Sequence, residues 1–210
     1  MDLGISGRTA AVAAGSAGLG FGSAKALADD GVKVAICGRD KAKLDRAVAE
    51  IGNGCIGIVC DVSTIDGARE FVAKATSALG HIDILVANGG GPKPGTFASI
   101  DIDDYQPALE RSMLATVAMC KDVIPEMQAR GWGRVVAITS SSVRQPIATL
   151  ILSNSSRAGL TSFLKTVSRE VAKDGVTVNT VQPGSHATDR IRQLYGDSLE
   201  GAADGVPAGV

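Results

Sequence analysis

"TAAVAAGSAGLGFG", residues 9–22, begins as a mostly apolar run and ends as a glycine-rich turn that leads into a helical pattern. A run that does not alternate between apolar and polar residues is typical of a strand covered on both faces of a parallel sheet. A glycine-rich turn at the start of a helix lets backbone N–H groups and the helix dipole meet a pyrophosphate. The glycines stand at 15, 18, 20 and 22, so strict GxGxxG spacing is absent, and a plain strand-to-helix turn remains the alternative.

The same alternation of strand and helix patterns continues along the chain. Apolar runs rich in β-branched residues occupy 9–14, 32–38, 55–60, 82–88, 134–140 and 176–182, with helix-length segments at 18–30, 41–51, 64–79, 103–130 and 154–174. This βαβ order predicts one doubly wound α/β domain: a parallel sheet of about six strands in the order 3-2-1-4-5-6, with helices on both faces. Beyond Tyr195 the composition turns rich in Gly, Ala and Asp, so we expect a domain over 1–195 and a flexible tail or partial lid over 196–210.

Composition excludes several classes of function. The chain has 210 residues and a net charge of −1 without a basic stripe, which argues against nucleic acid and anionic membranes as partners. Its four cysteines show no CxxC spacing, and two histidines do not make a metal cluster, so we expect no metal and buried free thiols. We find no signal peptide and no membrane-length apolar run, and we expect a cytoplasmic protein.

The end of the second predicted strand, "ICGRD" at 36–40, bears on cofactor choice. A site that prefers NAD carries an acidic residue there for the ribose 2′-hydroxyl, whereas this chain has Gly38 followed by Arg39. A guanidinium can fork onto a 2′-phosphate, so we predict NADP over NAD. The alternative is that Arg39 is a solvated loop charge.

Five separated motifs occur in one order: "VAAGSAGLG" (12–20), "CDVS" (60–63), "LVANGGG" (85–91), "ITSSS" (138–142) and "VQPGSHAT" (181–188). In this order they resemble the short-chain dehydrogenase/reductase family, most closely its bacterial 3-oxoacyl-acyl-carrier-protein reductases, over about residues 3–195. The resemblance implies a Rossmann-type fold and hydride transfer between NADP(H) and a small carbonyl or alcohol substrate. It also implies that the cofactor is held by Gly15, Ser16, Gly18, Leu19, Gly20, Arg39, Asp61, Val62, Asn88, Gly89, Pro183, Gly184 and Thr188.

The catalytic positions implied by the resemblance depart from the family pattern. The family's serine falls at Ser140, and its Tyr-x-x-x-Lys begins thirteen residues later, where "LSNSSRAGL" (152–160) places Ser153 and Arg157. The family's asparagine position falls on Ser112. The resemblance therefore implies a catalytic set of Ser140, Ser153 and Arg157. The alternative is that Ser153 or Asn154 only caps a helix while Arg157 lies on the surface.

Chemistry leaves three interpretations of this altered set. An aliphatic hydroxyl is a weaker acid than a phenol, and a guanidinium does not give up its proton. A slower enzyme could take its proton from water, or His186 or Tyr195 could serve as a substitute acid. The third interpretation is a non-catalytic dinucleotide-binding sensor or scaffold.

The resemblance also concerns assembly and the end of the chain. The family's last helix and seventh strand have no counterpart in the sequence, so we expect strand six to form an exposed edge. By analogy, we expect a homo-oligomer built through the long helices at 103–130 and 154–174.

Overall fold

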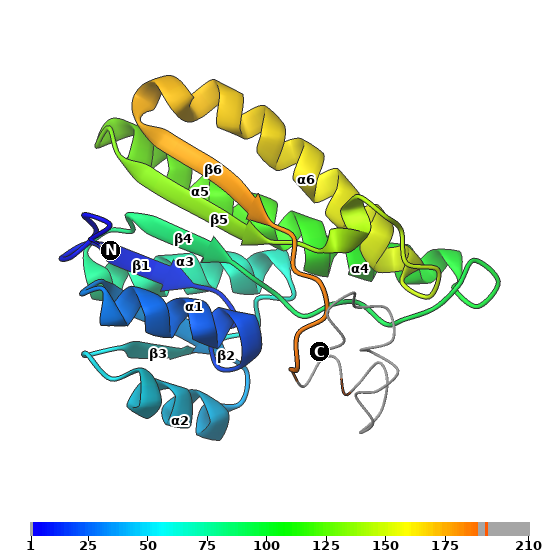
Figure 1. The fold of residues 1–210 in the computed structure, drawn as a ribbon, viewed down its shortest axis with the longest axis horizontal. Helices are drawn as coiled ribbons and strands as arrows, with labels where there is room; N and C mark the ends of the chain where they lie inside the picture. The colour runs from blue at the N-terminus through cyan, green and yellow to red at the C-terminus, as the bar shows by residue number, and fades with distance from the viewer. Residues whose placement is uncertain (1, 189–191, 193–210) are drawn as a thin grey trace.

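The computed structural model describes residues 2–188 and 192, and its centre is a six-stranded parallel sheet (Figure 1). The strands are β1 (Thr9–Val12), β2 (Lys33–Gly38), β3 (Ile56–Val59), β4 (Ile84–Ala87), β5 (Gly133–Ile138) and β6 (Val176–Val181). Their order is β3-β2-β1-β4-β5-β6, which confirms the predicted topology. Among the described residues, β3 and β6 form the two edges of the sheet, and the expected edge position of strand six is what the structure shows.

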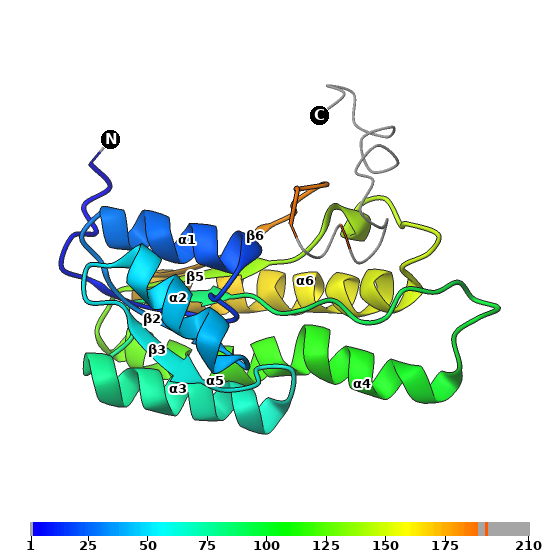
Figure 2. The same cartoon turned by 90° about the horizontal axis from the view of Figure 1, so that it is seen from below.

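Helices cover both faces of the sheet, as predicted (Figure 2). On one face α1 (Gly18–Asp29) and α2 (Lys41–Ile51) pack on a core that includes Ile36. On the other face α3 (Ile65–Leu79), α5 (Ala115–Ala129) and α6 (Ile151–Val171) bury Phe71, Met119 and Leu160 against the sheet. Among the described residues Phe71 is the one aromatic side chain in the buried core, in keeping with the low aromatic content. None of the helices in the described ranges has the length and apolar character needed to cross a membrane.

The predicted helix 103–130 is not continuous. A 3-10 turn (Ile102–Asp104) and α4 (Tyr105–Leu109) lead into a π-helical turn at Glu110–Leu114, and α5 follows it directly. Glu110 reaches across to the start of α3, where its Oε1 accepts a hydrogen bond of 3.1 Å from the Ile65 N–H. Such π turns are frequent at functional sites because they re-aim side chains. Here the turn carries Ser112 towards the interior.

Helix α6 begins three residues earlier than its pattern suggested. Leu150 occupies the N-cap position without a side-chain bond, so the interpretation of Ser153 or Asn154 as the cap is wrong. Asn154 instead clamps the preceding loop: its Nδ2 donates to Ile147 O at 2.8 Å. The helix gives way to a 3-10 turn (Ala172–Asp174) that stops at Gly175, whose φ of 73° is left-handed, a conformation that glycine adopts readily.

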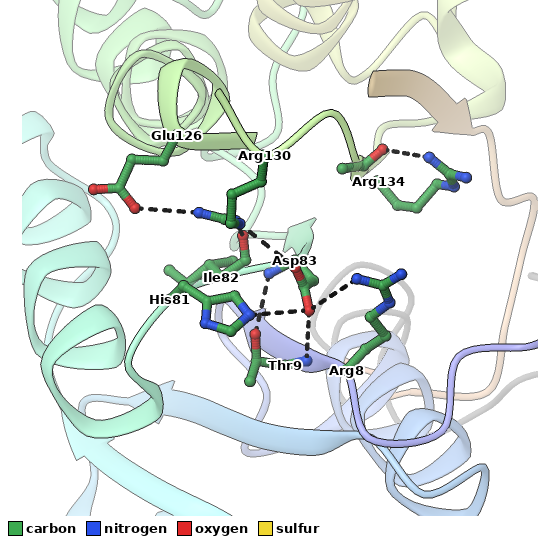
Figure 3. Close-up of polar contacts among 9 residues, drawn as sticks. Arg8, Thr9, His81, Ile82, Asp83, Glu126, Arg130 and Arg134 are labelled. Carbon is green, nitrogen blue, oxygen red and sulfur yellow. Dashed lines mark hydrogen bonds and ion pairs between the residues drawn. The ribbon is translucent and has the colours of Figure 1, made fainter. Parts of the chain in front are cut away.

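A buried charge lies at the edge where the strands begin (Figure 3). Asp83 directly precedes β4 and is 3% exposed. Its carboxylate lies 3.3 Å from His81 Nε2, 3.8 Å from Arg8 Nη1 and 3.7 Å from Arg130 Nη2. It also accepts a hydrogen bond from the Thr9 N–H at 3.4 Å. The network ties together the starts of β1 and β4 and the end of α5, on the side away from the strand tips where α/β proteins bind ligands.

Candidate cofactor and active site

The turn after β1 is packed too tightly to hold a side chain at Gly20. Ala14 adopts a left-handed φ of 48°, and its carbonyl accepts a hydrogen bond of 3.3 Å from Asn88 Nδ2. A Cβ on Gly20 would lie 2.4 Å from Ala14 O and 2.7 Å from that amide nitrogen. The first turn of α1 therefore sits directly against the ends of β1 and β4. Leu19, the second residue of α1, packs its half-buried side chain against the core on this face of the sheet, so only its backbone can contact a ligand.

The start of α1 differs from the starts of α2 and α3. Asp40 caps α2 and Thr64 caps α3 by accepting a first-turn N–H through their side chains. At α1 the N-cap is Ala17, and no side chain in the described part of the chain caps that helix. Its free N–H groups and the positive end of its dipole suit a phosphate. Gly18, with φ 56°, opens this helix, and a Cβ there would lie 3.5 Å from Thr188 Cγ2, so the 181–188 segment reaches the same turn.

Two residues of the turn face the end of β2. The Gly15 N–H donates to Cys37 O at 2.9 Å, and a Cβ on Gly15 would lie 2.8 Å from the Ile36 side chain. A Cβ on Gly38 would meet Ser16 Oγ at 2.7 Å. The Ser16 hydroxyl thus fills the space into which a side chain at position 38 would project.

Arg39 and Asp61 form an exposed pair beyond this point, with Arg39 Nη1 3.8 Å from Asp61 Oδ2. Partial burial opposes ionisation of Asp61, but hydrogen bonds from Ser63 and the charges of Arg39 and Arg111 together lower its pKa. Arg111 was not predicted from the sequence, because a charge on a predicted helix gives no sign that a π turn will aim it at the strand tips. Arg39, Asp61 and Arg111 together carry a net positive charge, which suits a phosphorylated ribose.

Ser140 stands at the tip of β5 beside the 181–188 segment. Its Oγ accepts a hydrogen bond of 3.1 Å from the Ser142 N–H, and the Ser141 N–H donates to Pro183 O at 3.1 Å. Gly184 follows in an exposed turn, and the exposed His186 folds back on it, with Nδ1 3.2 Å from Gly184 O. The structure thus keeps His186 within its own loop, and Tyr195 lies outside the described residues.

Arg157 also lies at the tip of β5, one helical turn beyond Ser153. Both residues are buried, at 9% and 7% exposure, so the interpretation of Arg157 as a surface charge is wrong. Its Nη1 donates to Ile138 O at 2.9 Å and to Thr139 O at 3.2 Å, directly before Ser140. The guanidinium therefore holds the end of β5 and faces the strand tips.

A small cavity of about 10 Å³ connects the two halves of the site. Its lining includes Val62, Asn88, Gly89, Ser112 and Arg157. Ser112 is 5% exposed, and its hydroxyl has no hydrogen-bond partner within the described residues. A space of this size holds about one water. Of the residues predicted to act in catalysis, Arg157 thus lines the same cavity as Val62, Asn88 and Gly89, which were predicted to bind the cofactor, whereas Ser140 and Ser153 do not line it.

The sequence profile of the short chain dehydrogenases matches residues 8–198. The chain belongs to this family. Dehydrogenase/reductase SDR family member 4 from Bos taurus is 32% identical over 197 residues, which cover 92% of this chain and 71% of the relative. Acetoacetyl-CoA reductase from Cupriavidus necator is 30% identical over 204 residues, with coverage of 95% and 83%.

Solved structures agree with this membership. L-Sorbose reductase from Gluconobacter frateurii, in complex with NADPH and L-sorbose, superposes with a TM-score of 0.89 at 29% identity, covering 97% of this chain and 83% of the neighbour. Actinorhodin polyketide ketoreductase with NADPH gives a TM-score of 0.87 at 29% identity, with coverage of 100% and 86%. This chain therefore has the Rossmann-type fold of the family and is an oxidoreductase of the short-chain dehydrogenase/reductase type.

Proposed function

We propose that this chain is an NADP-dependent oxidoreductase that interconverts a small carbonyl compound and its alcohol through an altered catalytic set. The observation that carries the proposal is the uncapped start of α1, packed against β1 and β4 so closely that Gly20 tolerates no side chain. This arrangement suits a pyrophosphate, and the neighbours L-sorbose reductase and actinorhodin ketoreductase are both described with NADPH.

Each part of the cofactor site has a defined role in this proposal. Backbone N–H groups from Ser16 to Gly20 bind the pyrophosphate, and Gly15, whose own N–H donates to Cys37 O, joins this turn to the end of β2. Arg39 pairs with the 2′-phosphate, and Asp61 with the Val62 backbone holds the adenine. Asn88 and Gly89 border the nicotinamide half, which Pro183, Gly184 and Thr188 cover. When bound, the cofactor supplies the hydride that reduces a carbonyl carbon.

The catalytic positions then work without a phenol. In the proposal Ser153 and Arg157 replace the family's tyrosine and lysine, and Ser112 replaces its asparagine. The hydroxyls of Ser140 and Ser153 orient the carbonyl oxygen, and the fixed positive charge of Arg157 favours negative charge that develops there. Neither a serine hydroxyl nor a guanidinium is a good acid near neutral pH, so the proton that the carbonyl oxygen takes up comes from water. Reduction is therefore slower than in relatives with the full set.

We further propose a 3-oxoacyl type of substrate. Support comes from acetoacetyl-CoA reductase, by its name a reductase of a 3-oxoacyl thioester, and from the polyketide ketoreductase neighbour. By analogy with the family we also propose a homo-oligomer. The four free cysteines, all buried, support a reducing compartment such as the cytoplasm.

A second candidate is a non-catalytic dinucleotide sensor or scaffold. The observation in its favour is that Arg157 already donates to two carbonyls at the end of β5, those of Ile138 and Thr139, a structural use that requires no substrate. This sensor or scaffold would bind the cofactor through the same residues as the enzyme of the leading proposal, and the two candidates differ only at the reaction centre.

NADPH consumption over a panel of ketones, including an acetoacetyl thioester, tests the leading proposal. We expect slow, saturable turnover that Arg157→Ala abolishes, together with a rise in melting temperature on adding NADPH. Cofactor binding without turnover of any ketone would select the sensor. No stabilisation by either NADPH or NADH would reject both candidates.

A further inference from the structure

Two of the four cysteines lie side by side at the ends of neighbouring strands. In the β2–β3 register Cys37 is paired with Ile58. Cys60 follows β3 directly, two residues after Ile58, so its side chain points to the same face of the sheet as that of Ile58. Both cysteines belong to the core on the α3 face, with exposures of 0% and 7%. Cys120 belongs to the same core but lies on α5, and Cys55 belongs to the core on the other face of the sheet. The four buried thiols therefore do not have the same surroundings.

Each of the two thiols has a backbone hydrogen-bond partner of its own. The Ala14 N–H donates to Cys37 Sγ at 3.3 Å, and Cys60 Sγ donates to Gly67 O at 2.9 Å. The contact with Cys37 lowers the pKa of the Cys60 thiol, whereas the same contact and burial raise the pKa of Cys37. Cys60 is thus the thiol that ionises first, with a second sulfur beside it.

The other two cysteines make useful comparisons. Burial raises the pKa of Cys55 to about 11 and that of Cys120 to about 12, and no charged neighbour offsets this. A thiol that stays protonated is a poor nucleophile towards oxidants. These two positions should therefore remain reduced under conditions that oxidise the pair.

We propose that Cys37 and Cys60 are an oxidisable dithiol that hydrogen peroxide closes into a disulfide, and that the closed form binds NADPH more weakly. The Cys60 thiolate attacks one peroxide oxygen, and the O–O bond breaks to give a sulfenic acid and hydroxide. The Cys37 thiol gives its proton to this hydroxide, which becomes water, and the Cys37 sulfur then attacks the Cys60 sulfur. The sulfenic oxygen leaves as hydroxide and takes up the proton that Cys60 released on ionising, which gives the second water. Two thiols are oxidised by two electrons in all, and one peroxide is reduced to two waters.

The effect on the cofactor follows from the backbone that flanks each sulfur. The Cys37 carbonyl accepts the Gly15 N–H, and the Cys60 N–H donates to Gly38 O at 3.1 Å. Asp61 comes directly after Cys60. Because a disulfide requires the sulfurs to approach closer than two thiols in contact, closing it shifts these backbone segments. This half of the inference rests on the proposed cofactor site.

The test treats the complete chain with peroxide, alkylates the remaining thiols and maps disulfides by mass spectrometry. We expect one Cys37–Cys60 link that is lost in Cys60→Ser and in Cys37→Ser and kept in Cys55→Ser and Cys120→Ser. Mapping the unmutated chain keeps the result decisive even if a variant folds poorly. No link, or a link through Cys55 or Cys120, would overturn the proposed dithiol.

NADPH titration of the reduced and oxidised chain tests the second half separately. We expect about tenfold weaker binding after oxidation, the equivalent of roughly one charge-assisted hydrogen bond, and recovery after a reductant is added. Equal affinity of the two forms would refute the coupling while the dithiol stands. If even the reduced chain does not bind NADPH, the proposed function fails, and the mapped disulfide remains an independent result.

Discussion

Replacing Arg39 by alanine should weaken NADPH binding much more than NADH binding. The side chain is 68% exposed, and its nearest opposite charge, Asp61 Oδ2, is 3.8 Å away, so that ion pair stabilises the chain by at most about 1 kcal/mol. A hydrogen bond between charged groups contributes about 1.5–3 kcal/mol, and the exposure of this site favours the lower half of that range. The expected loss is therefore roughly ten- to forty-fold in NADPH affinity, since about 1.4 kcal/mol is tenfold. NADH lacks the 2′-phosphate and should lose less than about twofold, because it forms no such charged hydrogen bond.

The assay is a fluorescence titration of each nicotinamide cofactor at one fixed ionic strength, because surface electrostatics are screened by salt. Lys41→Ala is the matched control: it removes one cation two residues away whose partner, Asp45, lies on its own helix. We expect it to leave both affinities nearly unchanged. An equal loss for NADPH and NADH, an equal loss in the Lys41 variant, or tighter binding of NADH by the unmutated chain would refute the assignment of Arg39.

Three further predictions concern the turn, the opposite edge of the sheet and the reaction centre. Gly20→Ala should abolish NADPH binding in a titration, whereas Gly22→Ala, whose Cβ meets nothing within 4 Å, should bind normally; equal affinities would show that the turn does not hold the cofactor. Asp83→Ala should lower the free energy of unfolding in urea by about 1–3 kcal/mol, because the buried Thr9 N–H loses its carboxylate acceptor and the partly exposed Arg8 and Arg130 lose a shared anion, and a loss below about 0.5 kcal/mol would contradict that role. The double variant Ser153→Tyr and Arg157→Lys should raise ketone reduction by about 10²–10⁴-fold through a restored proton donor, and an unchanged rate would mean that these positions do not correspond to the family's pair.

The sequence predicted the sheet better than it predicted the helix termini. Uniformly apolar runs separated by helical patterns leave few topologies, because parallel strands need right-handed crossovers. The predicted strand order is one of these few, and five of the six observed strands fall within the predicted runs, while β5 begins one residue before its run, at Gly133. The π turn at Glu110–Leu114 could not be predicted, because it shifts hydrogen-bond register without changing the apolar pattern. The start of α6 was placed too late because Ser153 and Asn154 are good capping residues, whereas the observed N-cap is Leu150.

At the site, counting residues from Ser140 placed Arg157 at the correct edge of the sheet, where the structure shows it buried. Counting could not show that its guanidinium donates to two carbonyls at the end of β5, since that depends on how far the side chain extends. Nor did it reveal the contact between Cys37 and Cys60, because strand register, not spacing along the chain, brings them together. Features set by local pattern were readable from the sequence, and contacts set by register were not.

A crystal structure of the chain in complex with NADP tests the central claim most directly. The account predicts a pyrophosphate on the free N–H groups at the start of α1, a 2′-phosphate on Arg39, and a nicotinamide ring between Ser140 and the segment that begins at Pro183, with Ser153 and Arg157 facing it. A cofactor bound elsewhere, or a nicotinamide ring directed away from Ser153 and Arg157, would contradict it.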